Sequence, residues 1–286
     1  MKISELFQKE RKVFSFEIFP PKRGATLESI TSVLGSLSDL KPDFMSVTYG
    51  AGGNSADAST CQLASMMKHQ FNVESMAHLT CVNSTRQDID LILKQLNEQG
   101  IENILALRGD INPDLPKRED FHYASELVAY IKQKGEFHLS GACYPEVHME
   151  AANWEADIEH LKYKVDAGVN HLITQLFFEN DIFFRFYERI RKAFITVPIQ
   201  AGIMPVVNKS QIERMVTMCG ASIPTALAKL LQRYEYDPIS LRSAGIEYAI
   251  RQIEGLVKEE VQGIHLYTMN QSETATQIAK EVRGWL

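Results

Sequence analysis

Eight apolar segments of strand length recur along the chain, and each is followed by residues with the apolar spacing of a helix. They span residues 13–19, 44–49, 74–81, 103–110, 138–145, 171–178, 198–205 and 263–270. Strands that alternate with helices form a parallel sheet, and a count of eight favours closure into a barrel. We therefore predict an α/β fold, a (β/α)8 TIM barrel, with an extra N-terminal helix over residues 2–11. We expect residues 1–286 to form a single domain, because barrels of this kind are routinely this long.

An open, doubly wound sheet is the alternative for the same order of elements. Such a sheet normally carries a G-x-G-x-x-G loop after its first strand. Here that position reads Pro20-Pro21-Lys22-Arg23-Gly24, which cannot serve as a dinucleotide-binding loop. The sequence of this loop therefore favours the barrel.

Composition excludes several classes of function. The net charge is -6 and the charged residues are mixed along the chain without a basic run, so we expect no nucleic-acid partner. The apolar stretches are too short to span a membrane, and Glu17 interrupts the first of them, which is unlike a signal peptide. The cysteines are far apart and form no C-x-x-C pair; they are Cys61, Cys81, Cys143 and Cys219. Reduced thiols of this kind indicate a cytoplasmic protein.

The C-terminal ends of the predicted strands carry polar side chains. In barrel enzymes these ends meet at one mouth, where the chemistry takes place. The residues expected at the mouth are Glu17, Thr48, His78, Arg108, Asp110, Tyr144, Gln175, Met204 and Tyr267. Glycine and aspartate are also ordinary turn residues, so Arg108-Gly109-Asp110 by itself could be a solvated turn. Taken together, the set suits the binding of a planar, polar heterocycle.

Glu17 is the most informative single residue. It lies between Phe16 and Ile18 in the first strand, where burial disfavours the charged form of a carboxyl group. A carboxyl group of this kind is suited to act as a general acid. The alternative is a glutamate that points into water or pairs with a lysine, but a charged residue within a barrel strand usually has a role.

Metal chemistry has little support in the sequence. His78 and Cys81 are three residues apart on a strand and would point to opposite faces. His148 follows Glu146 by two residues, but no H-x-H or H-E-x-x-H motif occurs. We predict no metal site, and a metal-dependent barrel hydrolase remains an alternative of low weight.

Other chemistries at a barrel mouth are also poorly supported. A Schiff base needs a lysine in the mouth, whereas Lys162 and Lys164 fall on the fifth helix, where a solvated face is usual. The loops after the seventh and eighth strands contain no glycine for a phosphate cradle. Cys81 and Cys143 lie late in apolar strands and are better explained by packing. A bound organic cofactor is the economical explanation.

Six motifs, each at the end of a predicted strand, resemble in order those of the methylenetetrahydrofolate reductase family. They are Phe16-Glu17-Ile18-Phe19-Pro20-Pro21, Val47-Thr48-Tyr49-Gly50-Ala51-Gly52-Gly53, His78-Leu79-Thr80-Cys81, Ala106-Leu107-Arg108-Gly109-Asp110, Tyr144-Pro145-Glu146-Val147-His148 and Tyr267-Thr268-Met269-Asn270. The likeness spans nearly the whole chain, which looks like the short bacterial form without a regulatory domain.

The resemblance implies an FAD-containing barrel that takes hydride from NADH or NADPH. The family then reduces 5,10-methylenetetrahydrofolate to 5-methyltetrahydrofolate in a ping-pong cycle that supplies methyl groups for methionine synthesis. Methylenetetrahydrofolate and NAD(P)H are thus the implied partners, and barrels of this family often form homo-oligomers.

The resemblance also implies roles for individual residues. Glu17 matches the general acid, and Asp110 matches a carboxylate beside the flavin that also contacts the pterin. Gln175, Gln211 and Thr48 match substrate-binding positions. The positions that match FAD-binding residues are Thr48, Tyr49, Ala51, His78, Arg108, Gly109, Asp110, Ala124, Tyr144, His148, Ala151, Asp157, His160 and Lys164.

The chain departs from the family pattern near the mouth. Gln271 stands where the family has an arginine that contacts folate, and Met215 replaces a common phenylalanine. His160 and Tyr163 stand where the family usually has an asparagine and an arginine that touch the flavin. We expect weaker binding of the folate glutamate tail or of the dinucleotide. A non-catalytic flavin- or folate-binding barrel is the alternative function, although intact Glu17 argues against it.

Overall fold

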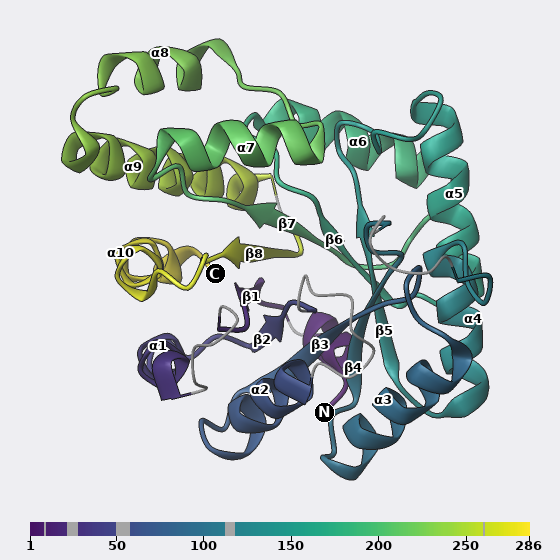
Figure 1. Cartoon of the computed structure of the whole chain (residues 1–286). Coiled ribbons are helices and arrows are strands. Elements are labelled where there is room, and N and C mark those ends of the chain that lie inside the picture. Colours follow the sequence, from purple (N-terminus) through teal and green to yellow (C-terminus); the bar gives the residue numbers. More distant parts are fainter. Residues whose placement is uncertain (9, 22–27, 50–57, 112–117, 260) are drawn as a thin grey trace.

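The computed structural model forms one closed barrel in which eight parallel strands are hydrogen-bonded in sequence order from β1 to β8 (Figure 1). It describes residues 1–8, 10–21, 28–49, 58–111, 118–259 and 261–286. The strands are β1 Val13–Ile18, β2 Phe44–Val47, β3 Glu74–Thr80, β4 Asn103–Leu107, β5 His138–Cys143, β6 His171–Thr174, β7 Ile199–Ile203 and β8 Gly263–Tyr267. The closed barrel is confirmed, and the open sheet is excluded because β1 pairs with both β2 and β8.

Helices surround the barrel on the outside (Figure 1). They are α1 Glu28–Ser38, α2 Ala58–His69, α3 Arg86–Glu98, α4 Ala124–Lys134, α5 Trp154–Ala167, α6 Asn180–Lys192, α7 Lys209–Cys219, α8 Thr225–Arg233, α9 Pro238–Lys258 and α10 Ser272–Val282, with 3₁₀ helices at Ile3–Gln8 and Arg283–Trp285. Asparagine is a favoured N-cap residue, so the sequence predicts Asn208 as the cap of α7. This cap is confirmed, because Asn208 Oδ1 accepts the N–H of Gln211 at 2.9 Å. The sequence also predicts that Gly168 ends α5, and this is confirmed by its φ of 130°.

The strands alternate between two surroundings. Their outward side chains, such as Phe16, Leu172 and Ile264, belong to one large apolar cluster that packs under the helices. Their inward side chains include polar groups such as Ser15 and His265, which are fully buried. Because successive strand residues point to opposite faces, apolar residues hold the helices, and the barrel interior combines polar side chains with apolar ones such as Phe44.

Most of the strands end earlier than predicted, and β6, for example, ends at Thr174 rather than at residue 178. The N-terminal helix over 2–11 is only a 3₁₀ helix over Ile3–Gln8, because Arg11 is held by Asp43 and the N–H of Lys12 by the carbonyl of Leu286. The fourth and eighth strands end earlier than 110 and 270. In both cases the backbone turns left-handed shortly after the strand, with a φ of 79° at Gly109 and 51° at Met269. The helix cap expected at Thr26 lies outside the described residues.

The N-terminal residues close the bottom of the barrel. Ile3 and Leu6 are buried against Phe44 and Met76 in an apolar cluster of their own. The ring of Phe7 lies 4.7 Å from that of His171, centroid to centroid. The additional N-terminal element therefore forms part of the core.

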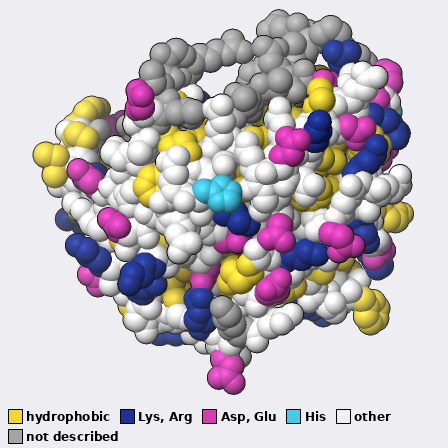
Figure 2. All heavy atoms as spheres, turned by 90° about the horizontal axis from the view of Figure 1, so that it is seen from below, with side chains coloured by type: hydrophobic (Ala, Val, Ile, Leu, Met, Phe, Trp, Pro, Cys, Tyr) yellow, Lys and Arg dark blue, Asp and Glu magenta, His cyan; other side chains and the backbone are white. Residues whose placement is uncertain are grey.

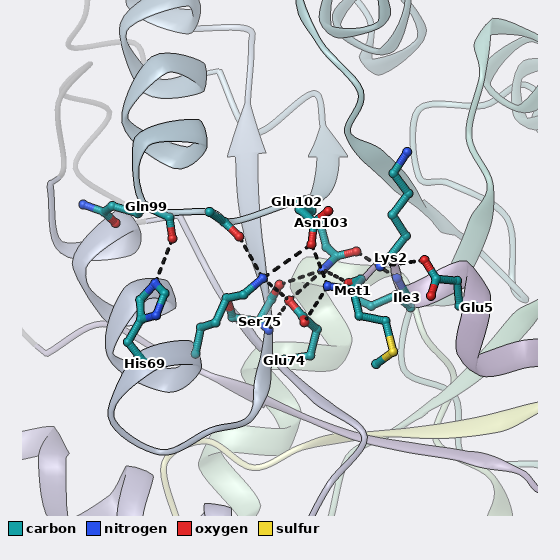
Figure 3. Close-up of polar contacts among 12 residues, drawn as sticks. Met1, Lys2, Ile3, Glu5, His69, Glu74, Ser75, Gln99, Glu102 and Asn103 are labelled. Atoms are coloured by element: carbon teal, nitrogen blue, oxygen red, sulfur yellow. Dashed lines mark hydrogen bonds and ion pairs between the residues drawn. The ribbon is translucent and has the colours of Figure 1, made fainter.

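Asn103 ties the N-terminal segment to the strands. Its Oδ1 accepts the N–H of Ile3 at 2.9 Å, and its Nδ2 lies 3.1 Å from the carbonyl of Met1 and 3.2 Å from that of Ser75. Figure 3 shows these contacts at the starts of β3 and β4, where Glu74 and Glu102 also receive the Met1 amino group. One buried amide on β4 thus satisfies backbone groups of two other segments, the N-terminal residues and β3.

Histidines are buried in the lower half of the barrel. Ser140 Oγ lies 3.2 Å from His138 Nε2 and 3.0 Å from His171 Nδ1. Burial lowers the pKa of His138 to about 4 and lowers that of His171 well below its usual value. These rings are therefore neutral at pH 7, as a buried site without a counter-ion requires.

The outside of the protein carries mixed charges. On the face drawn in Figure 2, basic and acidic side chains are interspersed, and apolar side chains are scattered between them. None of the helices in the described part of the chain is both long enough and apolar enough to cross a membrane.

We predict that replacing Asn103 by leucine destabilises the protein by about 3 kcal/mol. The change keeps the number of side-chain heavy atoms but removes the hydrogen bonds to the buried N–H of Ile3 and to the carbonyl of Ser75, at a cost of about 1–3 kcal/mol for each group. Urea unfolding measures this loss. The exposed Asn97→Leu on α3 is the control, and an equal loss in both variants would contradict the role of Asn103.

We also predict that stability falls as the pH drops from about 6.5 towards 4. His78, His138 and His171 have lower pKa values in the folded state than in the unfolded state, so unfolding at pH 5 takes up about three protons. The expected slope is roughly 4 kcal/mol per pH unit near pH 5. Urea midpoints between pH 7 and 5 measure it, with exposed His160→Gln as a control that keeps the slope. An uptake of less than one proton on unfolding would contradict the assignment of these three histidines as neutral in the folded state.

Candidate active site

The C-terminal strand ends converge on one cavity of about 670 Å³. All the residues predicted at the mouth line it: Glu17, Thr48, His78, Arg108, Asp110, Tyr144, Gln175, Met204 and Tyr267. Apolar side chains such as Leu107, Ile173 and Met215 complete the wall. This volume and this mixture of groups suit a large organic ligand.

Glu17 lies deep in this cavity between two histidines. Its Oε2 is 3.6 Å from Nε2 of His78 on β3 and 3.7 Å from Nε2 of His265 on β8. The side chain is 10% exposed. The carbonyl of Glu17 accepts the hydroxyl of Thr268 at 2.6 Å, which fixes the end of β1 against the end of β8. The carboxyl group is therefore held in place and screened from bulk water.

His78 is a neutral member of this group. Burial lowers the pKa of His78 to about 4, and the nearby Glu17 carboxylate only partly opposes this effect. Its Nε2 is buried and neither accepts nor donates a hydrogen bond within the described residues. A polar atom of this kind on a cavity wall is available to a ligand.

Arg108 and Asp110 stand at the rim. The guanidinium of Arg108 forms a bidentate pair with Glu150, with Nη2 at 2.7 Å from Oε1, and this hydrogen bond raises the pKa of Arg108. Gly109 between them has a φ of 79°, and a Cβ there would lie 2.8 Å from Thr80 Cβ. A glycine is therefore required for the chain to turn at this point.

Tyr144 and His148 form the side of the mouth beyond β5. Their rings meet edge to face at 4.6 Å. His148 Nδ1 accepts the N–H of Glu150 at 3.1 Å, so a neutral His148 carries its proton on Nε2. The N–H of His148 in turn donates to Asp157 Oδ2 at 3.2 Å, and burial raises the pKa of Asp157.

Six of the predicted site residues do not line the cavity. They are Ala124, Ala151, Asp157, His160, Lys164 and Gln211. His160 is exposed on α5, and Gln211 lies in the first turn of α7, one turn before Met215 on the cavity wall. Tyr49, Gly109 and His148 do line it, whereas Ala51 lies outside the described residues.

Lys164 is not on a solvated face, contrary to the usual expectation for a helix lysine. Its Nζ donates to the carbonyl of Ala142 at 2.6 Å, and burial lowers the pKa of Lys164. Gly141 leaves room for its stem, because a Cβ there would lie 3.1 Å from Lys164 Cδ. Lys162 on the same helix is half-exposed and pairs with Asp166.

The remaining departures from the family pattern also have clear positions. Gln271 precedes α10, and its Oε1 accepts the hydroxyl of Thr274 at 3.3 Å. Tyr163 is exposed and donates to Glu159. Met215 contributes to the cavity wall in place of an aromatic ring.

The thiols serve packing. Cys81 and Cys143 are buried in the outer apolar cluster, and burial raises the pKa of Cys81 to about 12. His78 faces the cavity while Cys81 packs outside the barrel, as the strand spacing predicted. Among the described residues, no group of three histidine, cysteine or acidic side chains is arranged to hold a metal ion.

The sequence reading missed three polar residues beneath the cavity: Ser15, Gln200 and His265. All are fully buried inside the barrel. The signal was present, because Ser15 and His265 each alternate with apolar neighbours along their strand, which indicates an inward-facing position. It was hidden because the strands were read as continuous apolar runs.

A closed barrel with a buried carboxyl group at its mouth belongs to the large class of barrel enzymes. The sequence profile of the family Methylenetetrahydrofolate reductase matches residues 2–283. The chain therefore belongs to the methylenetetrahydrofolate reductase family, and it is an oxidoreductase.

Curated relatives agree over most of the chain. The 5,10-methylenetetrahydrofolate reductases of Pectobacterium carotovorum and of Escherichia coli K12 are each 38% identical over 259 residues, which cover 91% of this chain and 86% of theirs. A plant relative, methylenetetrahydrofolate reductase (NADH) 1 of Arabidopsis thaliana, is 35% identical over 289 residues, which cover 96% of this chain but 49% of the plant protein.

Solved structures share the fold. An uncharacterized protein from Clostridium thermocellum, described as binding two copies of 5-methyl-5,6,7,8-tetrahydrofolic acid, superposes with a TM-score of 0.66 at 15% identity and full coverage of both chains. A 2,3-dimethylmalate lyase gives a TM-score of 0.54 at 8% identity, over 99% of this chain and 84% of the lyase. At these identities the likeness concerns the barrel alone.

We predict that Gly202→Ala disturbs the cavity wall through Tyr267. A Cβ at Gly202 would lie 2.3 Å from the carbonyl of Thr174 and 2.6 Å from the hydroxyl of Tyr267, which donates to that carbonyl at 2.5 Å. The ring must shift, at a cost of about 1–3 kcal/mol.

Thermal unfolding tests this coupling. Tyr267→Leu should relieve the part of the clash that involves the ring, whereas the contact with the Thr174 carbonyl remains. We therefore expect the double variant to be more stable than the sum of the single changes by ~1 kcal/mol. Gly284→Ala is the control, because nothing lies within 4 Å of a Cβ there. Strict additivity of Gly202→Ala and Tyr267→Leu would contradict the proposed contact.

Proposed function

We propose that this chain reduces 5,10-methylenetetrahydrofolate to 5-methyltetrahydrofolate with electrons from NAD(P)H that pass through FAD. The observation that carries the proposal is the position of Glu17, a buried carboxyl group at the floor of a cavity large enough for a stacked pair of heterocycles. The family membership supplies the reaction class. The folate that the Clostridium thermocellum neighbour is described as binding corresponds to the proposed product.

The cavity residues fit a flavin. Its wall is largely apolar, as an aromatic ring system requires, and His78 Nε2 is a buried polar atom available to such a ring. Arg108 at the rim offers a guanidinium to phosphate oxygens. The bound flavin supplies hydride transfer between the nucleotide and the folate. Ala124, Ala151, Asp157, His160 and Lys164 are proposed to bind its outer portion, beyond the cavity wall.

Glu17 is proposed as the general acid. The methylene bridge of the substrate opens only when the departing amine nitrogen gains a proton, and a carboxyl group held at the cavity floor can deliver that proton without competition from bulk water. The neighbouring His78 and His265 position the carboxyl group.

Asp110 and Gln175 are proposed to orient the ligands. Both line the cavity, from the ends of β4 and β6. Asp110 on the rim would place a negative charge beside the flavin and contact the pterin, which favours hydride departure. Gln175 and Thr48 would bind the pterin edge, and Gln211 on α7 the more distant part of the folate.

The wider biological setting follows from the same proposal. We propose that the chain is a single domain over residues 1–286, acts in the cytoplasm, supplies methyl groups for methionine synthesis and forms homo-oligomers. A barrel that binds flavin or folate without turnover is the alternative, and steady-state activity decides between the two.

We predict that Glu17→Gln retains FAD and its reduction by NADH but reduces methylenetetrahydrofolate at less than about a hundredth of the wild-type rate, the usual scale for general acid catalysis. Anaerobic absorption spectra measure both half-reactions, because NADH bleaches the flavin and the folate restores it.

The control is Glu155→Gln, the same change in the exposed first turn of α5. We expect wild-type behaviour from it in both half-reactions. If Glu17→Gln reoxidises with folate as fast as this control, Glu17 is not the acid.

A further inference from the structure

We propose that Gln200, a buried amide on β7, is a positioning residue that fixes the ring tautomer of His265 so that its Nε2–H faces Glu17. The proposal rests on the proposed role of Glu17 as proton donor. It concerns side chains beneath the cavity that the sequence did not single out. Hydrogen bonds connect the amide of Gln200 through Ser15 to the imidazole of His265.

The orientation of the Gln200 amide is determined by two carbonyl groups. Its Nε2 lies 3.2 Å from the carbonyl oxygen of Val13 and 3.1 Å from that of Ile264. Carbonyl oxygens only accept hydrogen bonds, so the NH2 group and not the amide oxygen must face them. Gly263 leaves the space for this arrangement, because a Cβ there would lie 3.1 Å from Gln200 Nε2 and 2.5 Å from the Val13 carbonyl.

The same NH2 group determines the direction of the Ser15 hydroxyl. Gln200 Nε2 lies 3.0 Å from Ser15 Oγ, the shortest of its three contacts, and an amide NH2 can only donate. We assign one of its two hydrogens to Ser15 Oγ and let the Val13 and Ile264 carbonyls share the other. The other polar partner of Ser15 Oγ is His265 Nδ1 at 2.7 Å. Within the described ranges, no further partner of Ser15 Oγ is present, and Gln200 offers it no acceptor and already occupies the nearby Val13 and Ile264 carbonyls, so the Ser15 proton goes to His265 Nδ1. An imidazole that accepts at Nδ1 is neutral and carries its proton on Nε2.

His265 Nε2 is the ring atom that faces the active site. It lies 3.7 Å from Glu17 Oε2 and 3.5 Å from Ser46 Oγ. The His265 side chain is 0% exposed. With the proton on Nε2, the ring presents a positive N–H dipole to the carboxyl group. The other tautomer would present a lone pair to it, which disfavours the carboxylate that remains after proton delivery.

Gln200 is thus expected to promote proton release from Glu17 without touching the substrate. When it is replaced by leucine, Ser15 loses its donor. The Val13 and Ile264 carbonyls also lose their donor and become alternative acceptors for the Ser15 proton. The Ser15 oxygen can then accept from Nδ1–H, so both tautomers of His265 become possible. The folate half-reaction should slow by roughly tenfold, the scale of one lost hydrogen bond to a catalytic group. Flavin reduction by NADH should be unchanged.

The first test is the ¹⁵N NMR spectrum of wild-type protein labelled at its histidines, with the His265 signals assigned by their absence in His265→Gln. We expect a single Nε2–H tautomer in the wild type, and a mixture of tautomers in Gln200→Leu and Ser15→Ala. Ser15→Thr keeps the hydroxyl and should keep the wild-type tautomer. A wild-type His265 that is protonated on Nδ1 would overturn the proposal without any variant.

The second test separates positioning from a general loss of stability. Gln252→Leu is the matched control, because Gln252 is another buried amide, on α9, whose Nε2 donates to the carbonyl of Phe177 at 2.9 Å. We expect the folate half-reaction of Gln252→Leu to stay at the wild-type rate at a temperature where both variants are folded. Equal rates in Gln200→Leu and Gln252→Leu would overturn the positioning role.

The two proposals fail in different ways. If wild-type protein binds flavin but never transfers electrons to the folate, the proposed function is wrong, whereas the NMR measurement still decides the tautomer. If folate reduction depends on Glu17 but is indifferent to Gln200 and Ser15, the proposed function stands and the positioning role is wrong.

Discussion

The structure depends on strands whose two faces lie in different environments. Outward side chains such as Phe16 and Leu172 are covered by helices, whereas inward ones such as Ser15 and His265 lie in a closed barrel that water does not reach freely. A polar group in such an interior must find a partner or stay neutral. For this reason, serines, histidines and amides form hydrogen bonds to one another below the cavity. They lie beneath Glu17.

The interior changes character from bottom to top. At the bottom, N-terminal residues and Asn103 close the barrel with apolar contacts and with hydrogen bonds to the backbone. At the mouth, the strands end and leave a cavity with a carboxyl group, a guanidinium and histidines on its wall. The stable end and the reactive end of the barrel are therefore separate, as is common in barrel enzymes. The buried histidines lie between them.

Much of the candidate site could be read from the sequence, because barrel topology brings strand ends together. Every residue assigned to a strand end lines the cavity. Residues assigned by family resemblance on helices, such as His160 and Lys164, do not, since their reach depends on helix packing that spacing cannot supply. Lys164 shows the limit well: sequence alone places it on a solvated helix face, yet its amine is buried against the Ala142 carbonyl.

The sequence by itself determined the order of strands and helices, the eightfold count, the polar strand ends and the family. These properties follow from local residue spacing and from motifs, which can be recognised without knowledge of the tertiary contacts. Only the tertiary structure decided which polar groups meet across the barrel. Ser15, Gln200 and His265 are as much as 250 residues apart, and their hydrogen bonds exist because closure places β1, β7 and β8 side by side.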